Sequence, residues 1–414
     1  MIKLPELLAP AGTLDAFKTA ILYGADAIYA GLPGFSMRAR AKITTEEVKT
    51  GIELAHAAGK HVYLAFNLFA HDGEYTNMPR VGEIIKYLNP DALIISDPGV
   101  LMWVREHHPD MPIHISTQAN ICSAASVKFW QAAGASLCVL AREVSHNEFI
   151  SIRRACPDIK LEIFVHGAMC MAYSGRCLLS NFITGRPANR GACAQLCRWK
   201  YDVILRECDS GIEMPICEDE RGAYIMNSKD LCLMPRLADV ISAGPDSLKI
   251  EGRNRSEYYV GSVVHAYRCA MDDYARDPAG FDPNKYMEML NVLESRGYTT
   301  AFFDGPVPSD AHNYDSARSV SDYHAAGVIT DVRSDCVVME LRNEIKSGEE
   351  ITLVLPGCSD SVNVRIANVI NAANDLIQPK MSAGQHNSIK IPLEWFPAEY
   401  TEKISPYVLA YKHK

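Results

Sequence analysis

The sequence predicts an α/β fold: a TIM-like (β/α)8 barrel with a large insertion after its seventh strand, followed by a small C-terminal antiparallel β-barrel domain. Three observations support this. Eight short apolar or β-branched runs occur in order, and amphipathic helical patterns separate most of them. Several helical stretches end at a glycine just before the next run. After residue 324 the helical patterns give way to short alternating runs separated by Gly, Asn, Asp and Ser turns.

The first observation fixes the order of the barrel elements. Residues 45–60 illustrate the helical pattern, because Val48, Ile52 and Ala55 share one face. The glycines expected to end helices are Gly24, Gly59, Gly134 and Gly244. Strand count alone does not prove closure, so a doubly wound open sheet is the alternative. The expected strands are 7–9, 27–30, 62–67, 92–96, 113–116, 137–141, 161–165 and 247–250.

The remaining segments complete the predicted domains. The barrel occupies residues 1–303, with a cysteine-rich insertion at about 167–246 that contains a hairpin (201–205 with 222–226) and a helix near 231–243. Helices are also expected at 257–276 and 284–296. A Pro- and Asp-rich linker at 304–324 leads to the C-terminal domain at 325–414, with expected strands at 325–332, 336–342, 349–356, 362–370 and 387–393.

Composition restricts the class of protein. Hydrophobic content of 48% and charged content of 22% are ordinary for a globular chain. The N-terminal residues lack a signal-peptide pattern, and no apolar run approaches the roughly 20 residues that cross a bilayer. We therefore expect a cytoplasmic protein with no membrane partner. The net charge of −9 argues against a protein that coats nucleic acid nonspecifically.

Four cysteines fall within 28 residues of the insertion: Cys170, Cys177, Cys193 and Cys197. In a reducing compartment, clustered thiols indicate a metal or iron–sulfur site more than disulfides. The spacing differs from a zinc ribbon, so an iron–sulfur cluster, a zinc ion and incidental cysteines all stay open. Cys217 and Cys232 are near enough in sequence to serve as substitute ligands.

Residues 170–201, which include these four cysteines, form a local basic island with no Asp or Glu. It favours contact with RNA phosphates, and an exposed loop is the alternative interpretation. Its arginines are Arg176, Arg186, Arg190 and Arg198.

Polar side chains follow most of the expected strands, at the end of the barrel where active sites form. We assign substrate binding to Arg38, Arg40, Asn67, Gln118 and Arg142, and catalysis to His166, Lys249, Glu251 and Arg253. Asp97, Thr117 and Glu143 share these strand ends. The alternative for each residue is a helix cap or a rim position, and His166 could also be a metal ligand or a half-buried structural histidine. Because guanidinium groups bind carboxylates in a bidentate manner, arginines at one mouth indicate a small anionic ligand.

Several motifs resemble the U-32 peptidase family across residues 4–330. They include ELLAPAG, YGADAIYAG, FVHGAMCMAYSGRCLLS, NRGACAQLCRWKY, MNSKDL and SLKIEGR. Within that family, SDPG, the run at residues 36–40, VKFWQ and NYDSARSVSD resemble the branch that hydroxylates wobble uridine in tRNA with prephenate in place of molecular oxygen. The family's older label is peptidase or collagenase, but the sequence has no HExxH or GxSxG motif.

The resemblance implies a 4Fe-4S cluster on Cys170, Cys177 and Cys193, with Cys197, Cys217 or Cys232 as the fourth ligand. It implies prephenate, a dicarboxylate, as co-substrate at the arginine-lined mouth. It further implies that the basic island holds the tRNA anticodon stem-loop. The predicted function is therefore a tRNA hydroxylase that forms 5-hydroxyuridine at the wobble position. The alternatives are a peptidase with a Cys/His site and a noncatalytic RNA-binding zinc protein.

Overall fold

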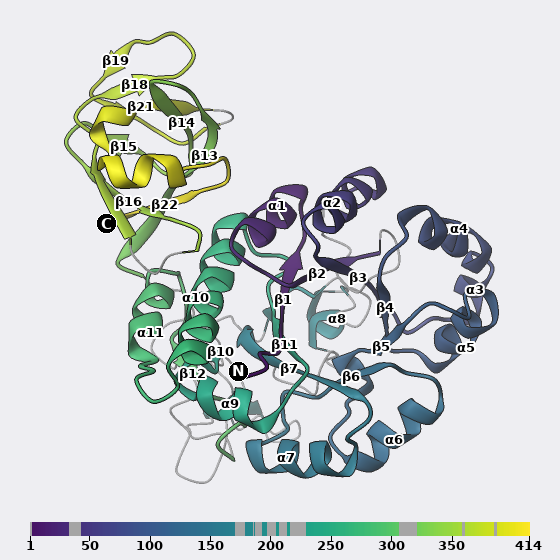
Figure 1. The fold of residues 1–414 in the computed structure, drawn as a ribbon. Helices are drawn as coiled ribbons and strands as arrows, with labels where there is room; N and C mark the ends of the chain where they lie inside the picture. Colours follow the sequence, from purple (N-terminus) through teal and green to yellow (C-terminus); the bar gives the residue numbers. More distant parts are fainter. Residues whose placement is uncertain are drawn as a thin grey trace.

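The computed structural model of the chain is a barrel ringed by helices with a curled sheet beside it (Figure 1). It describes residues 2–32, 43–169, 179–184, 186, 193–196, 204–206, 213–215, 229–305, 321–357, 361–384 and 387–414. Within this part of the chain, no helix is long and apolar enough to cross a membrane.

Eight parallel strands form the barrel in chain order, and the last strand pairs with both the first and the seventh. This double pairing closes the sheet, so the predicted (β/α)8 barrel is confirmed and the open sheet is excluded. Each of the eight expected runs is a strand. The strands are β1 (Glu6–Ala11), β2 (Ala27–Gly31), β3 (His61–Phe66), β4 (Ala92–Ile95), β5 (Ile113–Ile115), β6 (Leu137–Val139), β7 (Lys160–Gly167) and β11 (Ser247–Ile250).

Helices pack around the barrel and begin at residues that the sequence marks. Thr44 with Glu47, and Ser145 with Glu148, form capping boxes at two of these helices, satisfying backbone N–H groups that would otherwise lack acceptors. The four predicted terminal glycines all have positive φ, as expected for C-caps. The helices are α1 (Leu14–Leu22), α2 (Thr45–Ala57), α3 (Asp72–Tyr75), α4 (Met78–Leu88), α5 (Pro98–His107), α6 (Ala124–Ala132), α7 (His146–Ala155), α9 (Leu237–Ala243), α10 (Glu257–Arg276) and α11 (Asn284–Asn291).

The insertion between β7 and β11 differs from prediction in two places. The strand β8 (Ile204–Arg206) pairs with β9 (Glu213–Pro215), a partner that the sequence did not predict. The expected partner at 222–226 lies outside the described residues, so its pairing stays a prediction. The expected helix at 231–243 is instead strand β10 (Asp230–Cys232), a 3-10 turn at Met234–Arg236 and then α9, because Pro235 opens a helical turn but cannot lie within a helix. The insertion also holds α8 (Leu179–Thr184), and β10 pairs with β7 and with β12 (Tyr298–Thr299).

The C-terminal region is a curled antiparallel sheet with its own apolar core. It contacts the barrel at α1 and α10. The Tyr23 hydroxyl donates to the Val354 carbonyl at 2.7 Å and accepts the Leu409 N–H at 2.9 Å. In spatial order the strands are β17 (Ser361–Arg365), β16 (Glu350–Val354), β22 (Leu409–His413), β13 (Tyr323–Val332), β14 (Cys336–Leu341), β21 (Ser388–Pro392), β18 (Val369–Asn371) and β19 (Ile377–Gln378), with β15 (Ile345–Lys346) and β20 (Lys380–Met381) as a separate pair.

Candidate active site at the carboxyl-terminal mouth

A buried ion pair lies inside the barrel beneath the mouth. Alternate residues of a strand face the same side, so Glu162 and Phe164 of β7 project inward beside Lys249 of β11. The Lys249 ammonium lies 2.7 Å from Glu162 Oε1, and the two side chains are only 5% and 1% exposed. The same ammonium lies 4.4 Å from the centre of the Tyr29 ring and 5.6 Å from that of Phe164. These aromatic faces stabilise a cation that is almost fully removed from water.

Glu251 and Arg253 follow β11 directly above this pair, and both are buried. The Tyr29 hydroxyl lies 3.1 Å from Glu251 Oε2 and 3.0 Å from the Ile250 carbonyl. The Arg253 guanidinium carbon lies 5.7 Å from the centre of the Tyr29 ring. The structure thus brings together three of the four predicted catalytic residues around one tyrosine.

Two glycines allow the loop after β11 to pass close to its neighbours. A Cβ at Gly12, after β1, would overlap the carbonyl oxygen of Arg253. A Cβ at Gly167, where φ is +120°, would lie 2.6 Å from the carbonyl oxygen of Glu251. Both positions belong to quoted motifs, APAG and HGAM, and their role is to place Glu251 and Arg253 at the mouth.

Arg142, which follows β6, adds a further cationic side chain at the mouth. Its guanidinium carbon lies 3.9 Å from the centre of the Phe164 ring, and the side chain is half-buried after β6. Stacking on an aromatic face holds the guanidinium plane while leaving its N–H edge available to a ligand. Beside it, burial raises the pKa of Glu143, whose Oε2 has no hydrogen-bond partner among the described residues.

A second group of polar side chains spans β3 to β5. Ser96 donates a 3.0 Å hydrogen bond to Gln118 Oε1, and its hydroxyl lies 3.5 Å from the Asn67 carbonyl. The two predicted substrate-binding residues therefore lie at strand ends on either side of β4, and Ser96, at the end of β4, contacts the Asn67 backbone and the Gln118 side chain. Asp97, in contrast, caps α5 by accepting the N–H groups of Gly99 and Val100, which is the structural alternative for that position.

His166 is 1% exposed, and its ring lies among Tyr259, Tyr267 and Tyr298 at centroid distances of 6.0, 5.7 and 5.4 Å. Burial lowers its pKa to about 4, with a smaller opposing effect from Asp230, so the imidazole is neutral at pH 7. Its Nδ1 has no hydrogen-bond partner in the described part of the chain. A catalytic role for His166 stays a prediction.

Two of the predicted cluster ligands can be placed. Cys193 is exposed, and its sulfur accepts the N–H of Gln195 at 3.4 Å. Cys232 is buried on β10 beside the Tyr267 hydroxyl and the Met287 sulfur, and burial raises its thiol pKa to about 11. Among the described residues, no three His, Cys, Asp or Glu side chains are grouped as metal ligands. Cys170, Cys177, Cys197 and Cys217 lie outside the described residues.

Of the four arginines predicted to form the basic island, Arg186 lies within the described residues. Arg186 is half-buried, and its Nη2 is buried without a hydrogen-bond partner in the described part of the chain. The other three, Arg176, Arg190 and Arg198, lie outside the described residues, as do Arg38 and Arg40 of the predicted substrate site.

Sequence reasoning missed Tyr29, Ser96, Glu162 and Phe164. A signal for Glu162 was present, because a carboxylate in the middle of the apolar run LEIFV is rarely tolerated without a partner. Had the inward face of β7 been read by alternation, Glu162 and Phe164 would have joined the candidate residues. Tyr29 alternates in the same way on β2.

The closed barrel, with charged side chains above its strand ends, places the chain among the (β/α)8-barrel proteins whose active site is the carboxyl-terminal mouth. The family described as Peptidase family U32 matches residues 12–313, so the chain belongs to this family and the predicted membership is confirmed.

Similar proteins include tRNA hydroxylation proteins and a collagenase. The chain is 39% identical to tRNA hydroxylation protein P of Escherichia coli (strain K12), with 90% of each chain covered. It is 41% identical to tRNA hydroxylation protein P of Helicobacter pylori, covering 79% of this chain and 78% of that protein. It is also 30% identical to a collagenase of Porphyromonas gingivalis, covering 95% and 96%.

Proposed function

We propose that this protein hydroxylates tRNA, forming 5-hydroxyuridine at the wobble position in the cytoplasm. The observation that carries the proposal is the 39% identity to a tRNA hydroxylation protein over 90% of both chains. The similarity covers the barrel and the C-terminal sheet together, rather than the barrel alone. A charged, partly buried mouth is also consistent with chemistry on a polar substrate.

Prephenate is the proposed co-substrate, and the mouth supports a dicarboxylate ligand. Arg142 follows β6 and Arg253 follows β11, the two strands on either side of β7 in the barrel. Arg142 lies over the Phe164 ring and Arg253 near the Tyr29 ring, and both rings also lie beside the Lys249 ammonium. Each guanidinium can bind one carboxylate through paired N–H groups. Asn67 and Gln118 supply neutral hydrogen-bonding groups from the opposite strands. Glu251, near the Tyr29 hydroxyl, is the carboxylate we assign to proton transfer at the mouth.

A 4Fe-4S cluster is the proposed cofactor, held by Cys170, Cys177, Cys193 and Cys197. Cys193 is compatible with this role, because its sulfur is exposed and accepts the backbone N–H of Gln195, and hydrogen bonds of this kind are made to the sulfurs of protein-bound clusters. Cys232 fits less well as the fourth ligand, since it is buried beside a tyrosine hydroxyl and a thioether, and burial raises its thiol pKa. When bound, the cluster would supply electron transfer. Zinc is the alternative metal.

The anticodon stem-loop is the proposed RNA partner of the basic island, Arg176, Arg186, Arg190 and Arg198. In chain order this island follows β7, whose carboxyl end opens at the mouth. Backbone contacts there would position the stem-loop while an unstacked uridine enters the mouth.

The test combines a deletion strain with complementation. Mass spectrometry of tRNA should show loss of 5-hydroxyuridine derivatives in the deletion strain and their return with the wild-type gene. Cys193→Ser should fail to restore them, whereas Cys232→Ser should restore them. The modification should also disappear in a strain that cannot make prephenate. Unchanged 5-hydroxyuridine levels after deletion of every related gene would refute the function.

The cofactor needs its own measurement. Protein purified anaerobically should contain iron and sulfide, and Cys193→Ser should lose most of both while remaining folded by circular dichroism. Stoichiometric zinc with no iron under the same handling would contradict the cluster while leaving the RNA assay to decide the function.

A peptidase is the second candidate, because a relative 30% identical over 95% of the chain is named a collagenase. A nucleophilic cysteine needs a hydrogen-bonded base. His166 Nδ1 has no such partner among the described residues. Release of peptides from gelatin by wild-type protein, abolished by His166→Gln, would favour the peptidase.

A further inference from the structure

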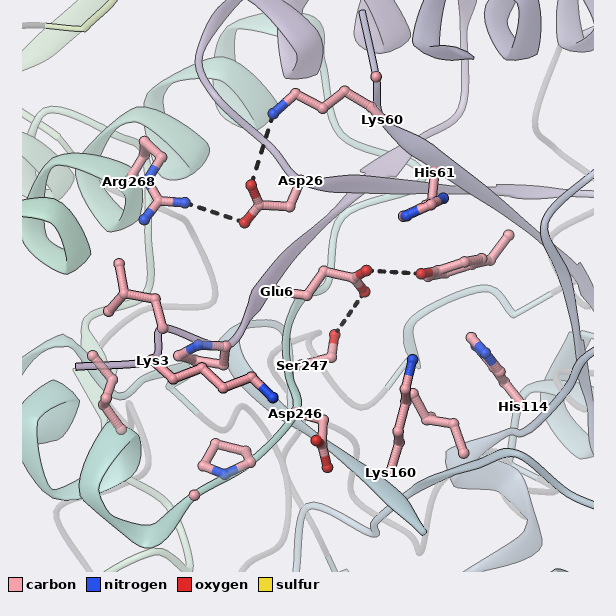
Figure 2. A pocket seen from close by; sticks show the side chains of 18 residues that line it. Lys3, Glu6, Asp26, Lys60, His61, His114, Lys160, Asp246, Ser247 and Arg268 are labelled. Carbon is pink, nitrogen blue, oxygen red and sulfur yellow. Dashed lines mark hydrogen bonds and ion pairs between the residues drawn. The ribbon is translucent and has the colours of Figure 1, made fainter. Parts of the chain in front are cut away.

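A cavity of about 690 Å³ lies at the opposite end of the barrel from the mouth. Its lining includes the first residues of several strands, among them Glu6 of β1, His61 of β3, Lys160 of β7 and Ser247 of β11 (Figure 2). Its size falls within the range of pockets that hold metabolites. Nothing in the proposed hydroxylation uses this end of the barrel.

Two of the three carboxylates that line the cavity, Asp26 and Asp246, are paired with cations. Asp26 lies 3.1 Å from Arg268 and 3.7 Å from Lys60. Asp246 lies 2.8 Å from Arg153 and accepts the Leu161 N–H at 2.9 Å. These ion pairs neutralise most of the negative charge of Asp26 and Asp246.

Two lysines at the rim have no such partner. Lys3 and Lys160 line the cavity, and neither forms an ion pair or hydrogen bond with another described residue. In Figure 2 both side chains reach toward the open space beside Asp246 and Ser247. Lys3 and Lys160 therefore outnumber Glu6, the lining carboxylate that has no cationic partner among the described residues.

The floor supplies buried hydrogen-bonding groups. Glu6 accepts from the Tyr63 hydroxyl at 2.8 Å and from the Ser247 hydroxyl at 3.3 Å, and burial raises the pKa of its carboxyl. His114 is 7% exposed, stacks edge-on against Tyr63 at 4.6 Å between centroids, and has no hydrogen-bond partner among the described residues. A neutral imidazole that lines a cavity can donate through one nitrogen and accept through the other.

We propose that this cavity is a second ligand site, which binds a small metabolite bearing a carboxylate or phosphate group. The anionic group lies between Lys3 and Lys160, and a neighbouring hydroxyl or carbonyl of the ligand hydrogen-bonds to His114. The Lys249–Glu162 layer separates this site from the mouth, so occupancy of one does not sterically block the other.

The first test locates an anion. Crystals of the full-length protein are soaked in tungstate, a heavy dianion, and the anomalous signal is mapped. We expect a peak between Lys3 and Lys160 that is lost in the Lys3→Ala/Lys160→Ala variant and kept in the Lys128→Ala control, whose lysine is exposed on α6. Absence of a peak in this cavity, or a peak that persists in the double variant, overturns the proposal.

The second test measures affinity and distinguishes the two anionic groups. Calorimetric titrations of the full-length protein use inorganic phosphate and malonate at matched ionic strength. Each lysine substitution should weaken binding of the preferred probe roughly fivefold to tenfold, as expected for one charge-assisted contact at a partly exposed site. Preference for phosphate indicates a phosphate ester, and preference for malonate indicates a carboxylate. Affinities equal in wild type and the double variant for both probes overturn the site.

Discussion

Replacing Lys249 by Met should destabilise the barrel strongly, because it leaves Glu162 as a buried charge without its partner. The pair is 2.7 Å apart with side chains 5% and 1% exposed, and Glu162 Oε2 already lacks a hydrogen-bond partner among the described residues. Breaking a pair buried to this degree costs about 3–5 kcal/mol of unfolding free energy. Methionine has a similar length, so loss of volume contributes little to this cost.

The two halves of the pair should not be equivalent. Glu162→Gln leaves the Lys249 ammonium between the rings of Tyr29 and Phe164, which continue to stabilise the cation. We expect this substitution to cost roughly 1–3 kcal/mol, less than Lys249→Met. The double variant removes both charges and should recover at least about 2 kcal/mol relative to Lys249→Met.

Urea unfolding followed by tryptophan fluorescence measures these differences, because Trp103 and Trp130 lie on barrel helices α5 and α6. Lys128→Met, an exposed substitution on α6, is the control and should change the unfolding free energy by less than about 0.5 kcal/mol. Additive losses in the double variant, with no recovery, would refute the description of this pair as a mutually dependent buried unit.

Three further predictions follow from single contacts. Gly12→Ala should cost about 1–3 kcal/mol, since its Cβ would overlap the Arg253 carbonyl, whereas Gly73→Ala, with no atom within 4 Å of the added Cβ, should be nearly neutral in the same urea titration. The pKa of His166 is 6.5 in the unfolded chain and about 4 in the folded protein. Between these two pH values the unfolded chain binds a proton that the folded protein does not, so the free energy of unfolding decreases by about 3 kcal/mol as the pH falls from 6.5 toward 4. His166→Gln should flatten that part of the stability–pH curve, and an unchanged curve would assign the dependence to other groups. Tyr23→Phe removes a hydroxyl that joins the barrel to the C-terminal sheet and should cost about 1–3 kcal/mol, seen as faster amide exchange in the sheet; unchanged exchange would mean that the bond is not needed for docking.

The barrel was predictable because each of its strands is short, apolar and followed by strong local signals. Thr44 with Glu47 marks a helix start, and Gly244 marks a helix end, so the boundaries lie within a few residues of expectation. The insertion was less predictable. Leu231 and Cys232 read equally well as helix or strand, and their pairing with β7, which is distant in sequence, selects the strand.

The site was predictable only in part, for a related reason. Residues that follow a strand, such as Glu251 and Arg142, can be found from strand ends alone. Residues within a strand, such as Glu162, become candidates only when the inward face is known, and closure of the barrel determines that face. The position of Asp97 after β4 is equally compatible with capping α5 and with binding a ligand, so the sequence could not distinguish these two roles.

The Lys249–Glu162 pair links the two ends of the barrel electrostatically. Toward the mouth, Lys249 shares the Tyr29 ring with Arg253. Toward the opposite cavity, the charge of Lys249 helps to lower the pKa of His114, and that of Glu162 helps to raise the pKa of Glu6. An anion bound beside Lys160 would therefore change the field acting on this pair without contacting it. Since the pair lies between the cavity and the mouth, we expect it to carry part of that change in field toward Glu251 and Arg253.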